Sequence, residues 1–397
     1  MSLISVAQKV ARDKRSVSDA AVHRARLGHS IGTQLERAAL SCDDADALAT
    51  ADMIKASARP ENIFHAEDLH NADGVLFDGY GSLNFCSTRL DPAYMALSSR
   101  RARKRARVAL DRCRPQSGEK LRLLTLTMPV LSDLSFGQVI SLLDAALVLL
   151  KKRQWFKTQV RGAIIGVEFT LGQESDHWHV HAHMLAWSKW VKWIELREQW
   201  TACLRSAAGR LGLDFNMLTR DGLAVVDVRL VTAKRRTGRG TVGIDDAIQE
   251  TCKYIVKGSQ FEKLDARQLL EVERVLRGRP MIETFGECNA QRGKAAAEQD
   301  TYLDTQNTTD GSLNIQVISE NEVISFEDEK KERGESLREV GARMIRAGRR
   351  ELWLEMLDYI LERRRKWRMT QLAKTFPFAT FRTLDGKVWH GTAVNPS

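Results

Sequence analysis

The chain contains, at residues 162–187, the stretch GAIIGVEFTLGQESDHWHVHAHMLAW. Its outer parts, residues 162–171 and 179–187, are largely apolar runs of strand length. The segment between them, residues 172–176, is polar and begins with glycine, as a turn requires. The stretch therefore predicts an antiparallel β-hairpin.

Strand and helix patterns alternate on both sides of this hairpin. Residues 121–127 and 222–231 are short apolar, β-branched runs that predict two further strands. Apolar residues recur at helical spacing over residues 136–156 and 188–210. The alternation predicts an α+β fold, in which helices pack on a central, mostly antiparallel sheet and helical extensions lie at both ends of the chain.

The length of 397 residues is enough for two or three domains. Composition divides the chain into five regions. These are an N-terminal region without a chemical signature at 1–83, a basic helical segment at 84–119, the α+β domain at 120–290, an acidic polar linker at 298–335 and a basic helical tail at 336–397.

The chain is basic, with 61 Lys and Arg against 51 Asp and Glu, a net charge of +10 and a pI near 9.4. This favours a polyanionic partner. Six of the eight residues at 100–107 are basic, namely Arg100, Arg101, Arg103, Lys104, Arg105 and Arg107. This segment is either a solvated helix face or a surface that contacts phosphates. Smaller basic clusters lie at 234–239 and 363–368.

Several classes of protein are disfavoured by the composition. The sequence has no run of about 18 uncharged apolar residues and no apolar segment of secretory-signal length at its start, so we expect a cytoplasmic protein without a membrane partner. The six cysteines are scattered singly, which predicts neither a disulfide framework nor a zinc knuckle.

Histidines are concentrated in the second strand of the hairpin, since four of the nine fall within residues 177–183. Side chains alternate between the faces of a strand, so His179, His181 and His183 share one face. Imidazoles two residues apart on a strand direct ring nitrogens toward one point, which suits a divalent metal ion.

The first strand of the hairpin can supply a carboxylate ligand. If the turn is centred between Glu174 and Ser175, Glu168 lies opposite His181, because each is about 6.5 residues from the centre. A site of two histidines and one carboxylate would leave positions open for water or a phosphate oxygen.

A His-x-His pair also occurs in cupins and metallo-hydrolases. A metallo-β-lactamase pattern needs Asp-His where Leu185-Ala186 stands, and a cupin pattern needs a glutamate that residues 187–190 do not contain. Both are disfavoured, and a solvated strand with surface histidines is the remaining alternative.

A tyrosine lies on a predicted helix that follows, DDAIQETCKYIVKGSQF at residues 245–261, for which Asp245 suits the N-cap. Glu250, Lys253, Tyr254 and Lys257 are spaced to share one side of this helix. A phenol is a poor nucleophile unless positive charge and a metal-activated electrophile lie nearby. Tyr254 alone would be read as a packing residue, but beside a metal site it is a candidate nucleophile.

Taken together, these segments resemble the HUH endonucleases, named for a His-hydrophobic-His metal motif, and in particular the plasmid rolling-circle replication initiators. The similar segments are LLTLTMP at 123–129, HVHAHML at 179–185, ETCKYIVK at 250–257 and RGRPMIETFG at 277–286. The resemblance covers residues 120–290, and it implies an HUH endonuclease-like catalytic domain there.

The resemblance also implies roles for single residues. His181 and His183 match the metal ligands, and we expect Glu168 and His179 to complete the set. The expected ion is Mg²⁺ or Mn²⁺, without an organic cofactor.

Tyr254 matches the nucleophile that becomes joined to the 5′ phosphate and frees a 3′ hydroxyl for a polymerase. Glu250 matches the carboxylate that in some members activates water to end the cycle. Lys253 and Lys257 match basic positions beside the tyrosine, where they would contact DNA phosphates.

The sequence is therefore interpreted as a plasmid replication initiator that nicks one strand of origin DNA. Its expected partners are single-stranded or melted origin DNA, a host helicase and a polymerase. The alternatives are a relaxase or transposase of the same superfamily, and a catalytically silent DNA-binding protein. The Glu250–Tyr254 spacing, with no second tyrosine nearby, favours initiation over the two-tyrosine enzymes.

Overall fold

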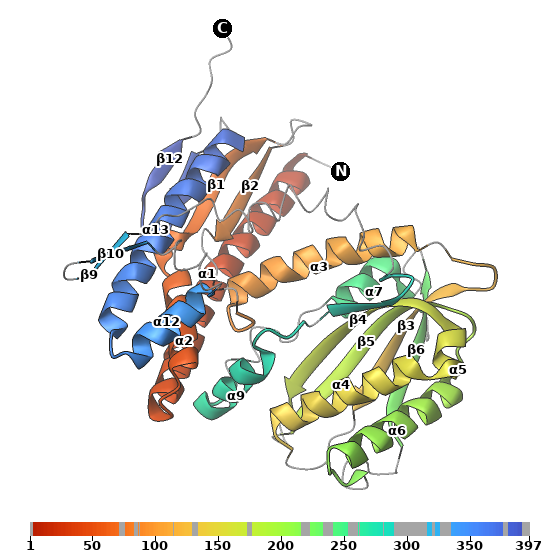
Figure 1. Cartoon of the computed structure of the whole chain (residues 1–397). Coiled ribbons are helices and arrows are strands. Elements are labelled where there is room, and N and C mark those ends of the chain that lie inside the picture. The colour runs from red at the N-terminus through yellow and green to blue at the C-terminus, as the bar shows by residue number, and fades with distance from the viewer. Residues whose placement is uncertain are drawn as a thin grey trace. The chain divides into compact units, whose positions relative to one another are not determined.

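The computed structural model describes residues 3–390 with internal gaps (Figure 1). The gaps are residues 71–75, 83–85, 87, 114, 129–133, 173–176, 216–222, 233–240, 253–260, 262, 281, 290–315, 320–321, 326–334 and 376–379. The chain forms two compact units. The first combines residues 1–96, 265–274 and 309–397, and the second combines residues 97–264 and 275–308.

The second unit is built on a six-stranded sheet whose strand order is β7-β6-β3-β5-β4-β8. All neighbouring strands are antiparallel except the pair β6 and β7. The strands are β3 (Lys120–Met128), β4 (Val160–Leu171), β5 (Trp178–Ser188), β6 (Val225–Thr232), β7 (Thr241–Gly243) and β8 (Ile282–Gly286). The predicted hairpin is confirmed as β4 and β5.

Helices cover both faces of this sheet (Figure 1). One face packs against α4 (Phe136–Lys152) and α6 (Trp193–Arg210), and α5 (Gln154–Gln159) follows α4 directly. The other face packs against α7 (Ile244–Thr251) and the part of α3 (Pro92–Arg112) that belongs to this unit. The predicted α+β class, with a mostly antiparallel central sheet and helices packed on it, is confirmed.

The residues predicted as one helix at 136–156 form two. Arg153 has extended backbone angles, φ −66° and ψ 132°, and caps the end of α4 before α5 begins. A capping box between Ser135 and Gln138 sets the start of α4. Phe136, at its first turn, packs 4.6 Å from the Phe169 ring and 4.7 Å from the Trp178 ring, which anchors α4 on the hairpin.

The first unit joins the two ends of the chain. Strand β1 (Ile63–His70) pairs with β2 (Leu76–Ser82) on one side and with β11 (Thr380–Thr383) on the other, and β12 (Val388–His390) completes a four-stranded sheet. Its helices are α1 (Leu3–Ser41), α2 (Ala45–Ser57), α12 (Leu337–Arg346) and α13 (Arg350–Thr375), with η1 (Pro60–Asn62) before β1 and most of α9 (Ala266–Leu276). A separate hairpin is formed by β9 (Gln316–Ser319) and β10 (Glu322–Ser325).

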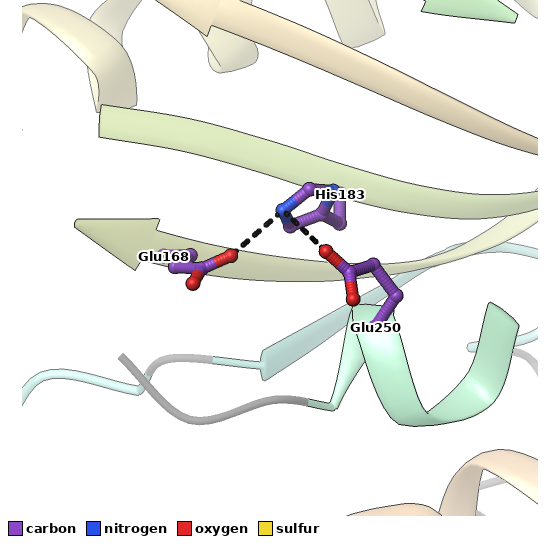
Figure 2. Close-up of side chains that lie close together, drawn as sticks. All are labelled: Glu168, His183 and Glu250. Atoms are coloured by element: carbon purple, nitrogen blue, oxygen red, sulfur yellow. Dashed lines mark hydrogen bonds and ion pairs between the residues drawn. The ribbon is translucent and has the colours of Figure 1, made fainter. Parts of the chain in front are cut away.

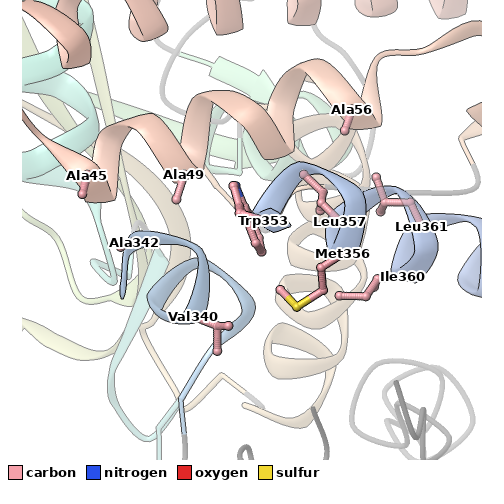
Figure 3. Close-up of a cluster of buried hydrophobic side chains, with 10 residues drawn as sticks. All are labelled: Ala45, Ala49, Ala56, Val340, Ala342, Trp353, Met356, Leu357, Ile360 and Leu361. Carbon is pink, nitrogen blue, oxygen red and sulfur yellow. The ribbon is translucent and has the colours of Figure 1, made fainter. Parts of the chain in front are cut away.

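The core of this first unit lies where α2, α12 and α13 meet (Figure 3). Small residues of α2, including Ala49, face the fully buried Trp353 and Leu357 of α13. An added Cβ at Gly341 of α12 would lie 2.6 Å from the Trp353 ring, so a glycine is needed there. The N-terminal region and the C-terminal tail therefore share one core.

All six cysteines are free thiols, and all but Cys42 are buried. Among the helices that the structure describes, none is both long enough and apolar enough to cross a membrane.

Helix α3, which carries the basic segment, begins at a buried carboxylate. Asp91 accepts hydrogen bonds from the backbone N–H groups of Cys86 at 2.8 Å, Ala93 at 2.9 Å and Tyr94 at 3.4 Å. The side chain is nevertheless removed from water, and this burial raises the pKa of Asp91 to about 6.

A raised pKa predicts that Asp91 makes the protein less stable as pH rises. Between about pH 4 and pH 6 the unfolded chain loses this proton while the folded chain keeps it, so the free energy of unfolding falls, by up to about 3 kcal/mol. Urea unfolding of the wild type and of Asp91→Asn across this range measures the effect. The variant has no titrating group at this position, so parallel pH profiles for the two proteins would contradict the prediction.

Candidate functional site

Strand β5 presents its histidines on one face, as predicted. Val180, Ala182 and Met184 are fully buried under the helices of the opposite face. His181 is half-buried, and His183 is buried, with 7% of its surface exposed. The alternation confirms that imidazoles line the face of the sheet that α7 covers.

The hairpin register also agrees with the prediction, because Glu168 of β4 pairs with His181 of β5. Its carboxylate, however, reaches the neighbouring imidazole (Figure 2). Glu168 Oε2 lies 3.1 Å from His183 Nε2. Glu168 is thus brought to the histidine face, and its closest imidazole is His183.

A second carboxylate comes from α7. Glu250 Oε1 lies 3.9 Å from the same His183 Nε2 (Figure 2). The ligand atoms of Glu168, His183 and Glu250 all lie within 4.8 Å of one another. The side chain of Glu168 is 15% exposed and that of Glu250 38%. Three elements therefore converge on a group that can hold a cation.

A glycine allows α7 to approach this closely. Gly166 of β4 pairs with His183 across the hairpin, and a Cβ at Gly166 would lie 1.8 Å from the Thr251 carbonyl oxygen. The next residue, Cys252, accepts a hydrogen bond from the Ser99 hydroxyl of α3 at 3.1 Å. The bare backbone at Gly166 thus places Glu250 beside His183.

The sequence did not identify the threonines of β3, which hold both histidines from the other side. Thr125 Oγ1 lies 3.2 Å from His183 Nδ1, and Thr127 Oγ1 lies 3.0 Å from His181 Nδ1. Each threonine is the cross-strand partner of its histidine. With Nδ1 engaged in this way, Nε2 is the nitrogen left to face a metal ion. The sequence did contain a signal for them, because Thr125 and Thr127 are two residues apart on their strand, as His181 and His183 are on β5.

The other two predicted ligands, His181 and His179, are not members of this group of described residues. The rings of His181 and His183 stack with centroids 6.2 Å apart, and burial, together with the neighbouring His183, lowers the pKa of His181. A lowered pKa keeps this imidazole neutral, the form that binds metals. His179 is half-buried on the same face and belongs to no such group among the described residues.

Several predicted residues fall where the structure gives no description. Lys253, Tyr254 and Lys257 lie within residues 253–260 and so outside the described residues, as does the side chain of Arg100. Helix α7 is described from Ile244 to Thr251, with Gly243 at the N-cap, and Asp245 lies in the first turn instead of at the predicted cap position.

The basic segment forms part of α3, whose described cations differ in exposure. Lys104, Arg105 and Arg107 are exposed, whereas Arg101 and Arg103 are half-buried. A cavity of about 370 Å³ lies between α3 and α7 and is lined by Arg103, Lys104, Arg107, Val108, Asp245, Ile248 and Gln249. Arg107 also forms an ion pair with Asp245. The segment thus presents cations next to the helix that carries Glu250.

Comparison with known proteins identifies the family. The pattern of the replication protein family Rep_1 matches residues 81–333, more than half of the chain. The chain therefore belongs to this replication protein family. No curated protein matches the chain, and no solved structure matches it.

The group suits a divalent ion on chemical grounds. Two carboxylates and an imidazole lie close together, with the His183 ring buried and the Glu250 side chain 38% exposed, and negative charges at this spacing favour a cation between them. Carboxylate oxygens suit Mg²⁺ and Mn²⁺, and imidazole nitrogens suit transition metals such as Zn²⁺ and Fe²⁺, so this set of donors fits a divalent ion without selecting one.

Removal of either threonine hydroxyl is expected to weaken metal binding. Thr125→Val and Thr127→Val keep the side-chain shape but leave Nδ1 without its oxygen partner, so the ring is less well oriented. We expect affinity for Mn²⁺, measured by isothermal titration calorimetry, to fall about 10- to 100-fold. Thr158→Val, at an exposed position of α5, serves as the control and should bind Mn²⁺ as the wild type does. Wild-type affinity in both β3 variants would contradict the role of the threonines.

Proposed function

We propose that this replication protein is a plasmid replication initiator that nicks one strand of its origin DNA through a tyrosine nucleophile and a divalent metal ion. The observation that carries the proposal is the convergence of Glu168, His183 and Glu250 within 4.8 Å, in a chain that belongs to a replication protein family.

Glu168 and His183 are the proposed core ligands, with His181 as the second imidazole of the same face. Mg²⁺ or Mn²⁺, when bound, would act as a Lewis acid on the scissile phosphate. Thr125 contacts His183 Nδ1 and Thr127 contacts His181 Nδ1, which would leave each Nε2 available to the ion. His179, on the same face of β5, is proposed as a further metal ligand.

Tyr254 is the proposed nucleophile. It follows Glu250 by four residues, so the covalent chain keeps its Cα within about 14 Å of that of Glu250. Its phenolic oxygen would form a bond to phosphorus as the bond to the 3′ oxygen breaks. The 3′ oxygen ends as a hydroxyl, and the 5′ phosphate stays joined to the tyrosine. Lys253 and Lys257 would favour the phenolate and neutralise the phosphate.

Glu250 is proposed to end the cycle. Its side chain is more exposed than that of Glu168, so water can reach it. The carboxylate would accept a proton from a water molecule, whose oxygen attacks the phosphotyrosine and releases the Tyr254 hydroxyl.

The cations of α3 fit the DNA partner that this activity requires. Phosphate contacts from this helix would make DNA binding salt-dependent without selecting a sequence. The proposed contact residues are Arg100, Arg101, Arg103, Lys104 and Arg105. The freed 3′ hydroxyl would be passed to a host polymerase, with a helicase opening the duplex ahead of it.

The covalent step is tested with single-stranded origin DNA carrying a 5′-side and a 3′-side label in separate reactions. The wild type with Mn²⁺ should form a denaturation-resistant adduct with the 3′-side fragment, and peptide mapping should locate it at Tyr254. Tyr254→Phe should lose the adduct and the nick, whereas Tyr359→Phe, an exposed tyrosine of α13, should keep both. Nicking that survives Tyr254→Phe would refute the mechanism. Binding without nicking in the wild type would favour the catalytically silent alternative.

The role of Glu250 is tested in the same assay. Glu250→Gln should still form the adduct but release it more slowly, by about 10²- to 10⁴-fold for loss of a general base. Glu198→Gln, at an exposed position of α6, is the matched control. If Glu250→Gln instead abolishes adduct formation and Mn²⁺ binding together, Glu250 is a metal ligand, and its assignment to termination is wrong. Release that requires a second tyrosine would favour the relaxase or transposase alternative.

A further inference from the structure

Two exposed tryptophans lie together in sequence where β5 leads into α6, in the segment Lys189-Trp190-Val191-Lys192-Trp193. Trp190 is 71% exposed and Trp193 is 47% exposed, whereas Val191 between them is buried. Large indoles are rarely left so open to water without a partner. We call these five residues the tryptophan segment.

A buried cation lies against Trp190. The guanidinium carbon of Arg122 is 5.4 Å from the centre of the Trp190 ring, and Arg122 is only 4% exposed. Its hydrogen bonds go to neutral oxygens, the carbonyl of Ser188 at 2.8 Å, the hydroxyl of Ser188 at 3.3 Å and the carbonyl of Lys120 at 3.4 Å. Of the described carboxylates, none lies within 4.0 Å of this guanidinium. The guanidinium therefore lies against the Trp190 ring with its positive charge balanced by no described carboxylate.

Trp193 repeats this arrangement. The guanidinium carbon of Arg197 is 5.2 Å from the centre of its ring. The indole N–H donates to the Val226 carbonyl at 2.9 Å, and Arg197 Nε donates to the Ala224 carbonyl at 3.1 Å. These bonds fix the ring and the cation before any ligand binds, which lowers the entropy cost of binding.

The charges around the tryptophan segment are mainly positive. Lys189 and Lys192 are exposed beside the indoles, and Arg122 and Arg197 lie against them. Among the described residues, the carboxylate that pairs with these cations is Glu195, 2.9 Å from Lys192. Aromatic faces interleaved with cations are the surface on which single-stranded nucleic acid binds, because bases stack on the rings and phosphates meet the cations.

We propose that the tryptophan segment, backed by Arg122 and Arg197, binds single-stranded DNA without sequence preference. Bases stack on Trp190 and Trp193, and Lys189 and Lys192 contact the phosphates. The inference rests on the proposed function, which supplies the single strand.

This surface is separate from the histidine site. Arg122 alternates with Leu123 on β3, so it points to the face opposite Thr125 and the histidines. Trp190 follows His183 by seven residues, which corresponds to roughly 20 Å along an extended chain. The tryptophan segment therefore holds DNA that flanks the nick, not the scissile phosphate.

The test uses the full-length protein and a fluorescein-labelled dT20 oligonucleotide in EDTA, followed by fluorescence anisotropy. Trp190→Ala should weaken dT20 binding about 5- to 150-fold, the range for loss of one stacked base, and Trp190→Phe should restore most of it. Lys189→Ala combined with Lys192→Ala should reduce the slope of log K against log salt by about 1.4. Leu211→Ala, at another exposed large apolar residue, is the control and should bind as the wild type does.

Two further measurements separate the possible outcomes. At a saturating concentration of a short origin oligonucleotide, Trp190→Ala should still form the Tyr254 adduct. This measurement distinguishes a loss of single-strand binding by the tryptophan segment from a loss of the proposed nicking activity. Unchanged dT20 affinity in Trp190→Ala would overturn the proposal and leave a protein partner as the occupant. An equal loss of affinity for a 20-base-pair duplex would also overturn it, because duplex bases cannot stack on the indoles.

Discussion

The antiparallel pairing of β4 with β5 is the constraint on which the candidate site depends. With Glu168 opposite His181, the carboxylate and the imidazoles emerge on the same face, and Glu168 reaches His183 at 3.1 Å. A slip of one residue would turn Glu168 to the opposite face, where the packed aromatic rings around Phe136 leave no place for a charge. The register of β4 with β5 therefore determines both the site and the core of the second unit.

The elements that pack against the hairpin supply the remaining side chains of the site. Strand β3 lies beside β5 and supplies a hydroxyl to each histidine, at Thr125 and Thr127. Helix α7 crosses the hairpin at Gly166, where the missing side chain lets the helix backbone touch the strand. His183 is thus held from one side by Thr125 of β3 and approached from the other by Glu250.

Much of this arrangement was predictable because it follows from strand alternation. The shared face of the histidines and the register of Glu168 needed only the period of two and the position of the turn. The contact of Glu168 with His183, instead of its direct partner His181, was not predictable, since a long side chain can reach diagonally across a sheet. Glu250 was identified for another role, and its distance of 3.9 Å from His183 could not be derived from helix periodicity.

The sequence by itself determined the α+β class, the hairpin and the cluster of histidines, because these depend on local periodicity and composition. Tertiary structure decided that β3 lies next to β5, which makes Thr125 and Thr127 partners of the histidines, and that β11 pairs with β1, which joins the two ends of the chain in one unit. It also placed Arg122 against Trp190, 68 residues later in the sequence. Strand order and contacts between distant residues depend on how the whole chain packs, and no local pattern encodes them.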